Sequence, residues 1–454
     1  MNTSAVQADL RLIPGQNEVQ SGLATAIHIV CPDLAGAGVD INGSNPDEQL
    51  FRVCNAMIHT SNENQGSGAT DNSLGISDAE LLGALQDIAH EEAITQGTMA
   101  TETSSAQQAN IGVRISELLG RVPSVGLAGV RYKIDGRQVK ASSLGFTAPQ
   151  SVRGGAAGDT DTIGSKLGGF VNGVVGFGDK DQTDREDGFD FNTYGITAGV
   201  DYRFTNNFVL GLAGGYSNLD VDIESTTGRS GGDVEADGYS FSVYGLYYLD
   251  EFYFNGVVSY GFNDYDTSRG VVIPSNNPSR DPIDATASAT TDSDQISLAG
   301  TVGYEFSRDA MTFGPYLRGD YLDVDIDGYT ESGAGGLNLV IDKQSLKSLT
   351  SALGGQLSYS LSQNFGIVVP HGRLEWIHEF EDASRSISAR YLHNVNNTFW
   401  TAPSDDPDRD YFTLGIGVST VFRGGIQAFL DYQTLLAKQD INEHVFTLGG
   451  RYEF

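Results

Sequence analysis

Tyr194-Gly-Ile-Thr-Ala-Gly-Val-Asp-Tyr-Arg-Phe204 is the stretch of this sequence that decides the fold. Every second residue of it is apolar or aromatic, and the residues between them are small, polar or charged. Side chains of a strand point alternately to its two faces, so one face of this segment is apolar and the other is polar. The stretch is therefore predicted to be a strand that separates an apolar phase from a wet one.

The same alternation recurs through the C-terminal two-thirds of the chain. Tyr and Phe stand where an apolar stripe begins or ends, which is typical of the aromatic girdles at membrane interfaces. A soluble sandwich also has an apolar face and a solvated face, so alternation alone does not exclude it. Tight turns that alternate with long polar loops, including 267–292, 328–345 and 381–408, favour a barrel. Twelve such segments are predicted: 167–178, 188–204, 207–221, 235–249, 252–266, 293–306, 311–327, 346–361, 364–380, 409–422, 425–436 and 441–454.

These segments predict a 12-stranded antiparallel transmembrane β-barrel over residues 164–454, because an even number of strands closes with both ends on the periplasmic side. No apolar run reaches the roughly 20 residues of a membrane-spanning helix. A membrane protein without such a run must be a closed barrel. The formal charge of −32 argues against a nucleic-acid partner, since neutralising phosphates needs a basic face.

Residues 1–122 are predicted to form a small, mainly helical region. Ser77 and Glu80 fit a capping box that starts a helix running to Ile88. Further helices are expected at 16–31, 47–59 and 103–121, but the apolar core they offer is thin. Cys31 and Cys54 are expected to form a disulfide if the region lies in an oxidising compartment, and are otherwise two buried thiols. Residues 1–20 lack the apolar core of a signal peptide, so either such a signal has been removed or the chain is the C-terminal piece of a longer protein.

A Gly/Ser-rich connector, residues 123–163, links the helical region to the barrel. Asp135-Gly136 is a two-residue hairpin signal between short apolar runs. From Pro123 to Lys166 the stretch carries more basic than acidic residues, unlike the rest of the chain. It is therefore a candidate for threading through a charged pore.

Charged residues are predicted on the inner face of the barrel. Such charges need partners or water, so they either pair with one another or hold a segment threaded through the pore. That segment would be the helix at 103–122 or the connector at 123–166. The predicted lumen charges are Asp201, Arg203, Glu305, Arg318, Asp320, Arg373, Glu375, Asp431, Arg451 and Glu453.

Signals for catalysis, cofactors and metals are weak. The chain has no Gly-x-Ser-x-Gly nucleophile motif, and His90-Glu91-Glu92 lacks the second His of a zinc-protease helix. His371 and Glu375 share one strand face, but His378 and Glu379 split across both, which favours a charge network over a metal site. No enzyme activity, cofactor or metal is predicted.

Several stretches, taken in order, resemble the translocator domain of autotransporters, the type V secretion proteins. The matching residues are Gly188-Phe-Asp-Phe-Asn-Thr-Tyr-Gly195, Leu210-Gly-Leu-Ala-Gly-Gly-Tyr216, Ser259-Tyr-Gly-Phe-Asn-Asp-Tyr265, Asp327-Gly-Tyr-Thr-Glu-Ser-Gly333, Arg373-Leu-Glu-Trp-Ile-His-Glu-Phe380 and the terminal Arg451-Tyr-Glu-Phe454.

The resemblance implies a barrel in the outer membrane of a Gram-negative bacterium that exports or displays its N-terminal region at the cell surface. It implies that Tyr452 and Phe454 belong to the assembly signal. It also implies as partners the barrel-assembly machinery, periplasmic chaperones, membrane lipids and lipopolysaccharide, with the barrel itself a monomer. Two alternatives stay open: a structural or adhesive surface protein, and a porin-like channel.

Overall fold

The computed structural model describes residues 9–67, 71–119, 131–134, 137–140, 166–224, 231–381, 383–422 and 426–453. Twelve long strands within these ranges form one closed antiparallel barrel, because successive strands pair around the ring, β20 pairs with β3, and β13 pairs with β15. The predicted 12-stranded barrel is confirmed. Its strands are β3 (Leu167–Lys180), β4 (Phe189–Thr205), β5 (Phe208–Ile223), β6 (Gly232–Leu249), β7 (Phe252–Ile273), β8 (Ile283–Tyr304), β10 (Met311–Ile326), β13 (Gln344–Tyr359), β15 (Gly366–Glu379), β18 (Asp410–Phe422), β19 (Ile426–Leu436) and β20 (Ile441–Glu453). The short β9 (Phe306–Arg308) and β14 (Leu361–Gln363) extend two of the hairpins.

The outer face of the barrel carries an apolar band between two sets of aromatic side chains. Leu212, Phe241 and Val258 lie in this band and are more than half exposed. On one border, Tyr239 packs between Tyr216 and Phe262, with ring centroids 5.3 Å apart on each side. On the other border, Tyr304 packs between Phe252 and Phe306. An apolar belt with aromatic borders is the surface that a bilayer requires.

Beyond the first aromatic border, the two faces of the strands exchange polarity. On β5, Leu219 and Val221 are buried inside the barrel, while Asp220 and Asp222 point outward into solvent. The polar loop predicted at 267–292 is wrong for the same reason. β7 continues to Ile273 and β8 starts at Ile283, with their apolar residues now facing inward. This part of the barrel projects out of the membrane as a water-soluble extension.

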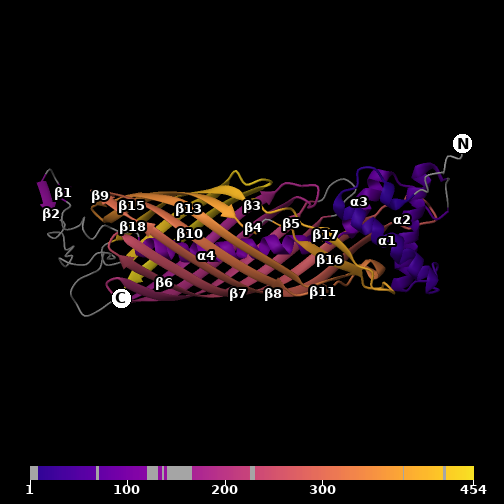
Figure 1. Ribbon diagram of the computed structural model, residues 1–454, viewed down its shortest axis with the longest axis horizontal. Helices are drawn as coiled ribbons and strands as arrows, with labels where there is room; N and C mark the ends of the chain where they lie inside the picture. The colour runs from indigo at the N-terminus through magenta and orange to yellow at the C-terminus, as the bar shows by residue number, and fades with distance from the viewer. Residues whose placement is uncertain are drawn as a thin grey trace.

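Three helices cover the open end of this extension (Figure 1). They are α1 (Glu18–Gly36), α2 (Pro46–Asn62) and α3 (Asp78–Ile88), with the short turns η1 (Leu10–Leu12) before them and η2 (Glu63–Ser67) after α2. The capping box predicted at Ser77 and Glu80 is present. Residues 9–90 are called the lid below. Within the described residues, no helix combines the length and the apolarity needed to cross a membrane.

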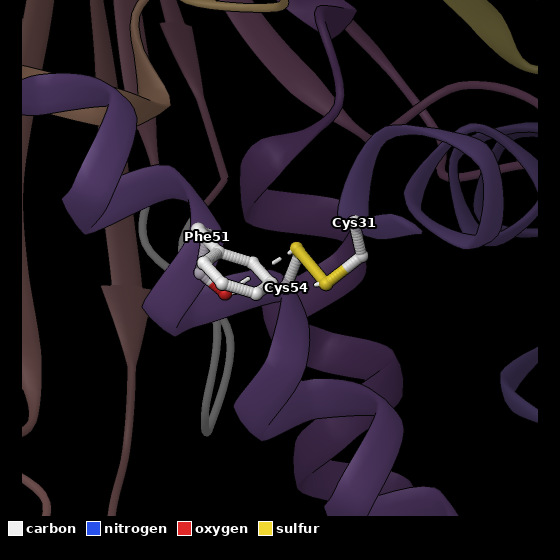
Figure 2. Close-up of a disulfide and its surroundings, with 3 residues drawn as sticks. All are labelled: Cys31, Phe51 and Cys54. Atoms are coloured by element: carbon white, nitrogen blue, oxygen red, sulfur yellow. Dashed lines mark hydrogen bonds between the residues drawn. A yellow bond between two sulfur atoms is a disulfide. The ribbon is translucent and has the colours of Figure 1, made fainter. Parts of the chain in front are cut away.

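The disulfide expected between Cys31 and Cys54 is present. It joins α1 to α2 (Figure 2). The Cys54 sulfur lies 3.4 Å from the carbonyl oxygen of Phe51. Both cysteines are buried in the core of the lid. The bond therefore fixes the packing of two helices rather than closing a surface loop.

A fourth helix, α4 (Glu91–Leu119), runs along the inside of the barrel (Figure 1). It begins at Glu91, earlier than the predicted Thr103. The sequence does not predict this start, because residues 91–102 contain Gly97 and several Thr residues and have a weak helical preference of their own. Contacts inside the barrel supply the missing stability. Of the two segments proposed to occupy the pore, the structure places this helix there, whereas most of the connector lies outside the described residues.

The long loops predicted at 328–345 and 381–408 are also wrong, because they contain a small sheet. Its strands, in spatial order, are β11 (Tyr329–Thr330), β12 (Leu339–Ile341), β16 (Ser386–Tyr391) and β17 (Trp400–Pro403), and the 3-10 turn η4 (Gly335–Leu337) precedes β12. This outer sheet packs against the lid and shares one core with it. The two loops thus form a structured platform at the end of the barrel.

In the connector, the predicted hairpin forms between β1 (Arg131–Ile134) and β2 (Arg137–Lys140), with Ile134 opposite Arg137. Asp135-Gly136 and the rest of residues 123–163 lie outside the described residues, as does Phe454.

Candidate functional site: the barrel lumen

The helix in the lumen lies off centre. α4 comes closest to β3, β4, β5, β6 and β7, which form one side of the barrel wall. A row of polar side chains at helical spacing faces this wall, and each of them is buried: Thr103, Gln107, Asn110 and Arg114. The Asn110 amide donates to the Thr197 hydroxyl at 3.1 Å, and the Asn172 amide donates to the Asn110 carbonyl at 2.9 Å. Polar contacts therefore fix the rotation and depth of the helix.

Arg114 and Asp201 form the central contact of this row. The Arg114 Nε donates to Asp201 Oδ2 at 2.8 Å, and the Tyr244 hydroxyl donates to the same oxygen at 3.0 Å. Arg114 is fully buried, and its guanidinium lies 5.4 Å from the centre of the Phe170 ring. A buried ion is costly unless it is paired, so removal of either partner should disturb the helix strongly.

The opposite wall carries a charge network of its own. Arg318 donates to Asp320 at 2.8 Å and to Glu375 at 2.6 Å. The Tyr316 hydroxyl at 2.7 Å and the Thr413 hydroxyl at 2.8 Å complete the hydrogen bonds of Glu375. These groups satisfy one another within the barrel and do not depend on α4.

A cavity of about 270 Å³, lined by polar and apolar side chains, separates this wall from α4. Ser104, Gln108 and Gly112 line it on the helix side, and Arg318 and Glu375 line it on the barrel side. A second cavity of about 100 Å³ lies beside His371 and Asp431, which pair at 2.7 Å. The helix thus fills most of the lumen but leaves a crevice along one wall.

Apolar side chains close the lumen toward the lid. Met99 packs in one cluster with Phe189 and Phe191, and Ala100 packs in another with Leu322 and Val324. This collar lies in the extension where the inner face of the strands is apolar. These two apolar clusters lie between the crevice and the lid.

Above the collar, Arg269 joins three parts of the structure. This buried residue of β7 donates to both carboxylate oxygens of Glu331 beside β11, at 2.9 and 2.6 Å. It also donates to the carbonyl of Asp87 in α3 at 2.8 Å and to that of Leu337 in η4 at 3.2 Å. One guanidinium thus connects the barrel, the outer sheet and the lid.

Two titratable groups lie where the chain passes from the lid into the lumen. The Nε2 of His90 is 3.1 Å from the Ile387 carbonyl, so this nitrogen carries the proton of a neutral imidazole. Burial lowers the pKa of His90 to about 4. Burial raises the pKa of Glu92 to about 8. Both side chains are therefore uncharged in the folded protein near neutral pH.

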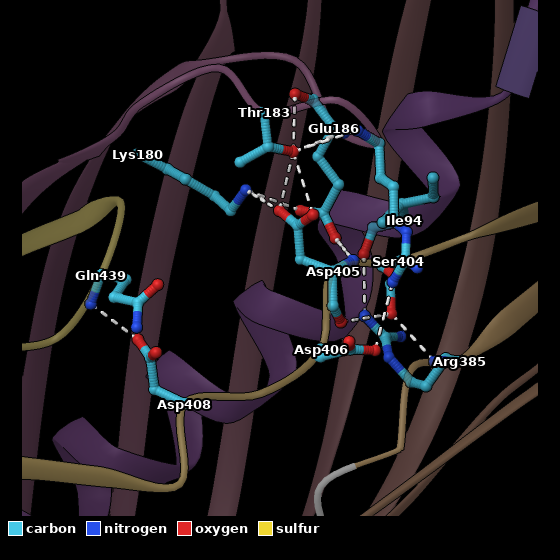
Figure 3. A network of polar contacts seen from close by, with 11 residues as sticks. Ile94, Lys180, Thr183, Glu186, Arg385, Ser404, Asp405, Asp406, Asp408 and Gln439 are labelled. Atoms are coloured by element: carbon cyan, nitrogen blue, oxygen red, sulfur yellow. Dashed lines mark hydrogen bonds and ion pairs between the residues drawn. The ribbon is translucent and has the colours of Figure 1, made fainter. Parts of the chain in front are cut away.

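Figure 3 shows a polar network that holds the loops around this junction. Lys180 pairs with Asp405 at 2.6 Å and with Glu186 at 3.2 Å. Arg385 donates to the carbonyl of Ile94 in α4 at 3.2 Å. These contacts link the β3–β4 loop, the β15–β18 loop and the lumen helix.

The predicted lumen charges have different partners in the structure. Asp201 binds α4 through Arg114, whereas Arg318, Asp320 and Glu375 bind one another. Asp431 pairs with His371, and Arg373 donates to Gln433. Glu305 and Arg451 are buried in the wall, Arg203 is partly buried, and the side chain of Glu453 is outside the described part. Tyr452, predicted in the assembly signal, points outward.

Sequence reasoning missed Arg114, the partner of Asp201 on the helix. The spacing of Thr103, Gln107, Asn110 and Arg114 by four, three and four residues is a signal that could have found it, because such residues share one helix face. Arg269 and Glu331 offered no comparable signal. They are far apart in the sequence and were placed in segments expected to be polar loops.

A family model described as the autotransporter β-domain matches residues 169–433. An uncharacterised protein in the trpE-trpG intergenic region of Pseudomonas putida is 27% identical over 45% of this chain and 33% of its own length. Esterase EstA of Pseudomonas aeruginosa is 24% identical over 55% of this chain and 37% of its own length. The chain thus spans about a third of the length of these curated relatives.

Among solved structures, the translocator domain of the autotransporter NalP from Neisseria meningitidis covers 65% of this chain and 90% of its own, with a TM-score of 0.47 and 17% identity. The transport unit of AIDA-I from Escherichia coli covers 65% of this chain and 92% of its own, with a TM-score of 0.46 and 15% identity. The matched family region is the autotransporter β-domain. It covers most of the barrel and more than half of the chain. The chain belongs to the autotransporter family and is an outer-membrane β-barrel translocator of a Gram-negative bacterium.

Proposed function

We propose that the barrel exports residues 9–90 and displays them at the cell surface, leaving α4 in the lumen. The observation that carries this proposal is the continuous path of the chain. The lid lies beyond one end of the barrel (Figure 1). From there α4 runs through the lumen toward the opposite end, where β3 begins and β20 ends. Under this proposal, α4 is the part of the exported chain that stops inside the pore and seals it.

Surface accessibility tests the export step. An epitope inserted after Asp40, in the exposed segment between α1 and α2, should be accessible to antibody on intact cells. A matched epitope in the short turn at Asp250, at the opposite end of the barrel, should become accessible only after the outer membrane is permeabilised. An Asp40 epitope that is accessible only in permeabilised cells would contradict the proposal.

Single-channel recording tests the seal. The full chain in a planar bilayer should show low conductance, and a chain beginning at residue 164 should show large, stable openings. This outcome separates a plugged translocator from the porin-like alternative. Equal large conductance from both proteins would show that α4 does not seal the pore.

A structural or adhesive role of the displayed lid is the second candidate. The core that the lid shares with the outer sheet favours lasting display over release. The names esterase and protease belong to relatives, and we propose no catalytic activity for the lid.

For assembly, we propose membrane lipids, lipopolysaccharide, periplasmic chaperones and the barrel-assembly machinery as partners of a monomeric barrel. Replacement of Phe454 by Ser should lower the amount of protein in the outer membrane without lowering its synthesis, as measured by fractionation and immunoblotting. Normal insertion of that variant would speak against an assembly signal at the terminus.

A further inference from the structure

The lid has no complete core of its own. Along α1, one face is buried, including Leu23, Ile27, Val30 and Leu34. Part of this packing is with the outer sheet, because α1 also lies along β17. The backbone of Gly22 is so close to the strand that a Cβ there would lie 3.1 Å from the Thr401 carbonyl.

The second helix makes the same kind of contact. α2 packs on η4, and a Cβ at Gly336 would lie 2.2 Å from the Pro46 carbonyl and 2.6 Å from the Leu50 nitrogen. The Gly336 amide donates to the Gln49 side chain at 3.0 Å. Backbone contacts this close require a glycine in the platform, so the loop between β10 and β13 is shaped to receive this helix.

The outer sheet supplies another part of the same core. The residues facing the lid are almost fully buried, whereas their neighbours on the same strands, such as Ser386 and Thr401, are exposed. Without the lid, this face would be a continuous apolar patch in water, which soluble surfaces rarely carry. The buried face consists of Leu339, Ile341, Ile387, Ala389, Tyr391, Trp400 and Ala402.

The sheet is also attached to the barrel independently of α1 and α2. Arg269 of β7 holds Glu331, and backbone bonds of 2.8 and 2.9 Å join Ser288 of β8 to Ser332. The platform can therefore be in place when the barrel is formed and before the helices arrive.

We propose that the outer sheet is the surface on which the exported helices fold and to which they stay bound. This inference rests on the proposed export of the lid and adds what happens at the surface. Burial of the lid on the sheet favours the exported state, so the barrel's own loops help to hold the chain outside. The partner of this apolar face is residues 9–90 of the same chain.

Proteolysis of intact cells tests the proposal with two neighbouring substitutions on β16. Ile387→Asp places a charge on the face that meets the lid, and Ser386→Asp places the same charge on the exposed face. In Ile387→Asp, protease should degrade the lid at least tenfold faster than in the wild type, while the barrel keeps its heat-modifiable migration on gels. Ser386→Asp should change neither the rate at which the lid is degraded nor the migration of the barrel.

The Asp40 epitope, carried in the same proteins, separates this inference from the proposed export. If the epitope is accessible and the lid of Ile387→Asp still resists protease, the outer sheet is not the surface on which the helices fold, and the proposed export still stands. An inaccessible epitope in the wild type would refute export. If Ile387→Asp lowers the amount of barrel, the milder Ile387→Ala replaces it, and protection of the lid equal to that of the wild type would then overturn the inference.

Discussion

Arg114 is the residue whose loss should affect the lumen most. Arg114→Met would leave Asp201 buried without its cation, and breaking such a pair typically costs about 3–5 kcal/mol. The helix should then leave the wall more often, and single-channel recordings should show frequent large openings. The double variant Arg114→Met/Asp201→Leu removes both charges and should be closed more of the time than the single variant. If Arg114→Met opens no more often than the wild type, the pair of Arg114 and Asp201 does not hold α4 in the lumen.

His90 makes the stability of the lid depend on pH. Its pKa is lowered to about 4 in the folded protein, from 6.5 when exposed. Between these two values the unfolded chain binds a proton that the folded chain does not, so the lid loses stability as the pH falls from about 6.5 to 4, by up to about 1.4 kcal/mol per pH unit.

Urea-dependent protease resistance of the lid, compared between wild type and His90→Gln at pH 7 and pH 5, measures this contribution. The stability of the wild type relative to the variant should decrease on acidification. Glu92, whose pKa is raised to about 8, changes stability in the opposite direction between about 4.5 and 8, but it is present in both proteins and drops out of the difference. An unchanged difference would show that His90 does not titrate as a buried neutral group.

At the scale of elements, the disulfide between α1 and α2 should stabilise the lid but not the barrel. Closing a loop of this size removes about 3 kcal/mol worth of chain entropy from the unfolded state. The double variant Cys31→Ser/Cys54→Ser should therefore lose protease protection of the lid at a lower urea concentration, while the heat-modifiable barrel is unaffected. Treatment of the wild type with reductant should have the same effect. Equal urea midpoints would contradict this role.

The elements that could be predicted are those with a local signal. The strands follow from a period of two, and α3 follows from the cap formed by Ser77 and Glu80. The outer sheet has no such signal, because β11 and β12 are two and three residues long and β12 pairs with β16, which is far away in the chain. The start of α4 was missed because the helix is stabilised by the barrel around it rather than by its own sequence.

At the scale of the molecule, alternation predicted which charges face the lumen but not which groups they contact. Asp201 binds Arg114, which is 87 positions away in sequence, and Glu375 binds Arg318 across the intervening strand β13. The first pair depends on how the helix is placed in the lumen, and the second depends on which strands lie close together in the wall. The thin core predicted for the lid has a related explanation, because part of that core comes from the barrel loops.

The exchange of polarity along β5 predicts where the membrane ends. Leu212 and Asp220 lie on the same outward face of this strand, one on each side of Tyr216. An Arg at the bilayer midplane of a barrel costs about 2–4 kcal/mol, and near the interface it costs about 0–1 kcal/mol. Leu212→Arg should therefore reduce insertion into the outer membrane, and Asp220→Arg should leave it unchanged, as measured by fractionation and heat-modifiability. Equal loss in both would mean that the bilayer extends over the acidic part of the strand, and that the extension carrying the lid is not in water.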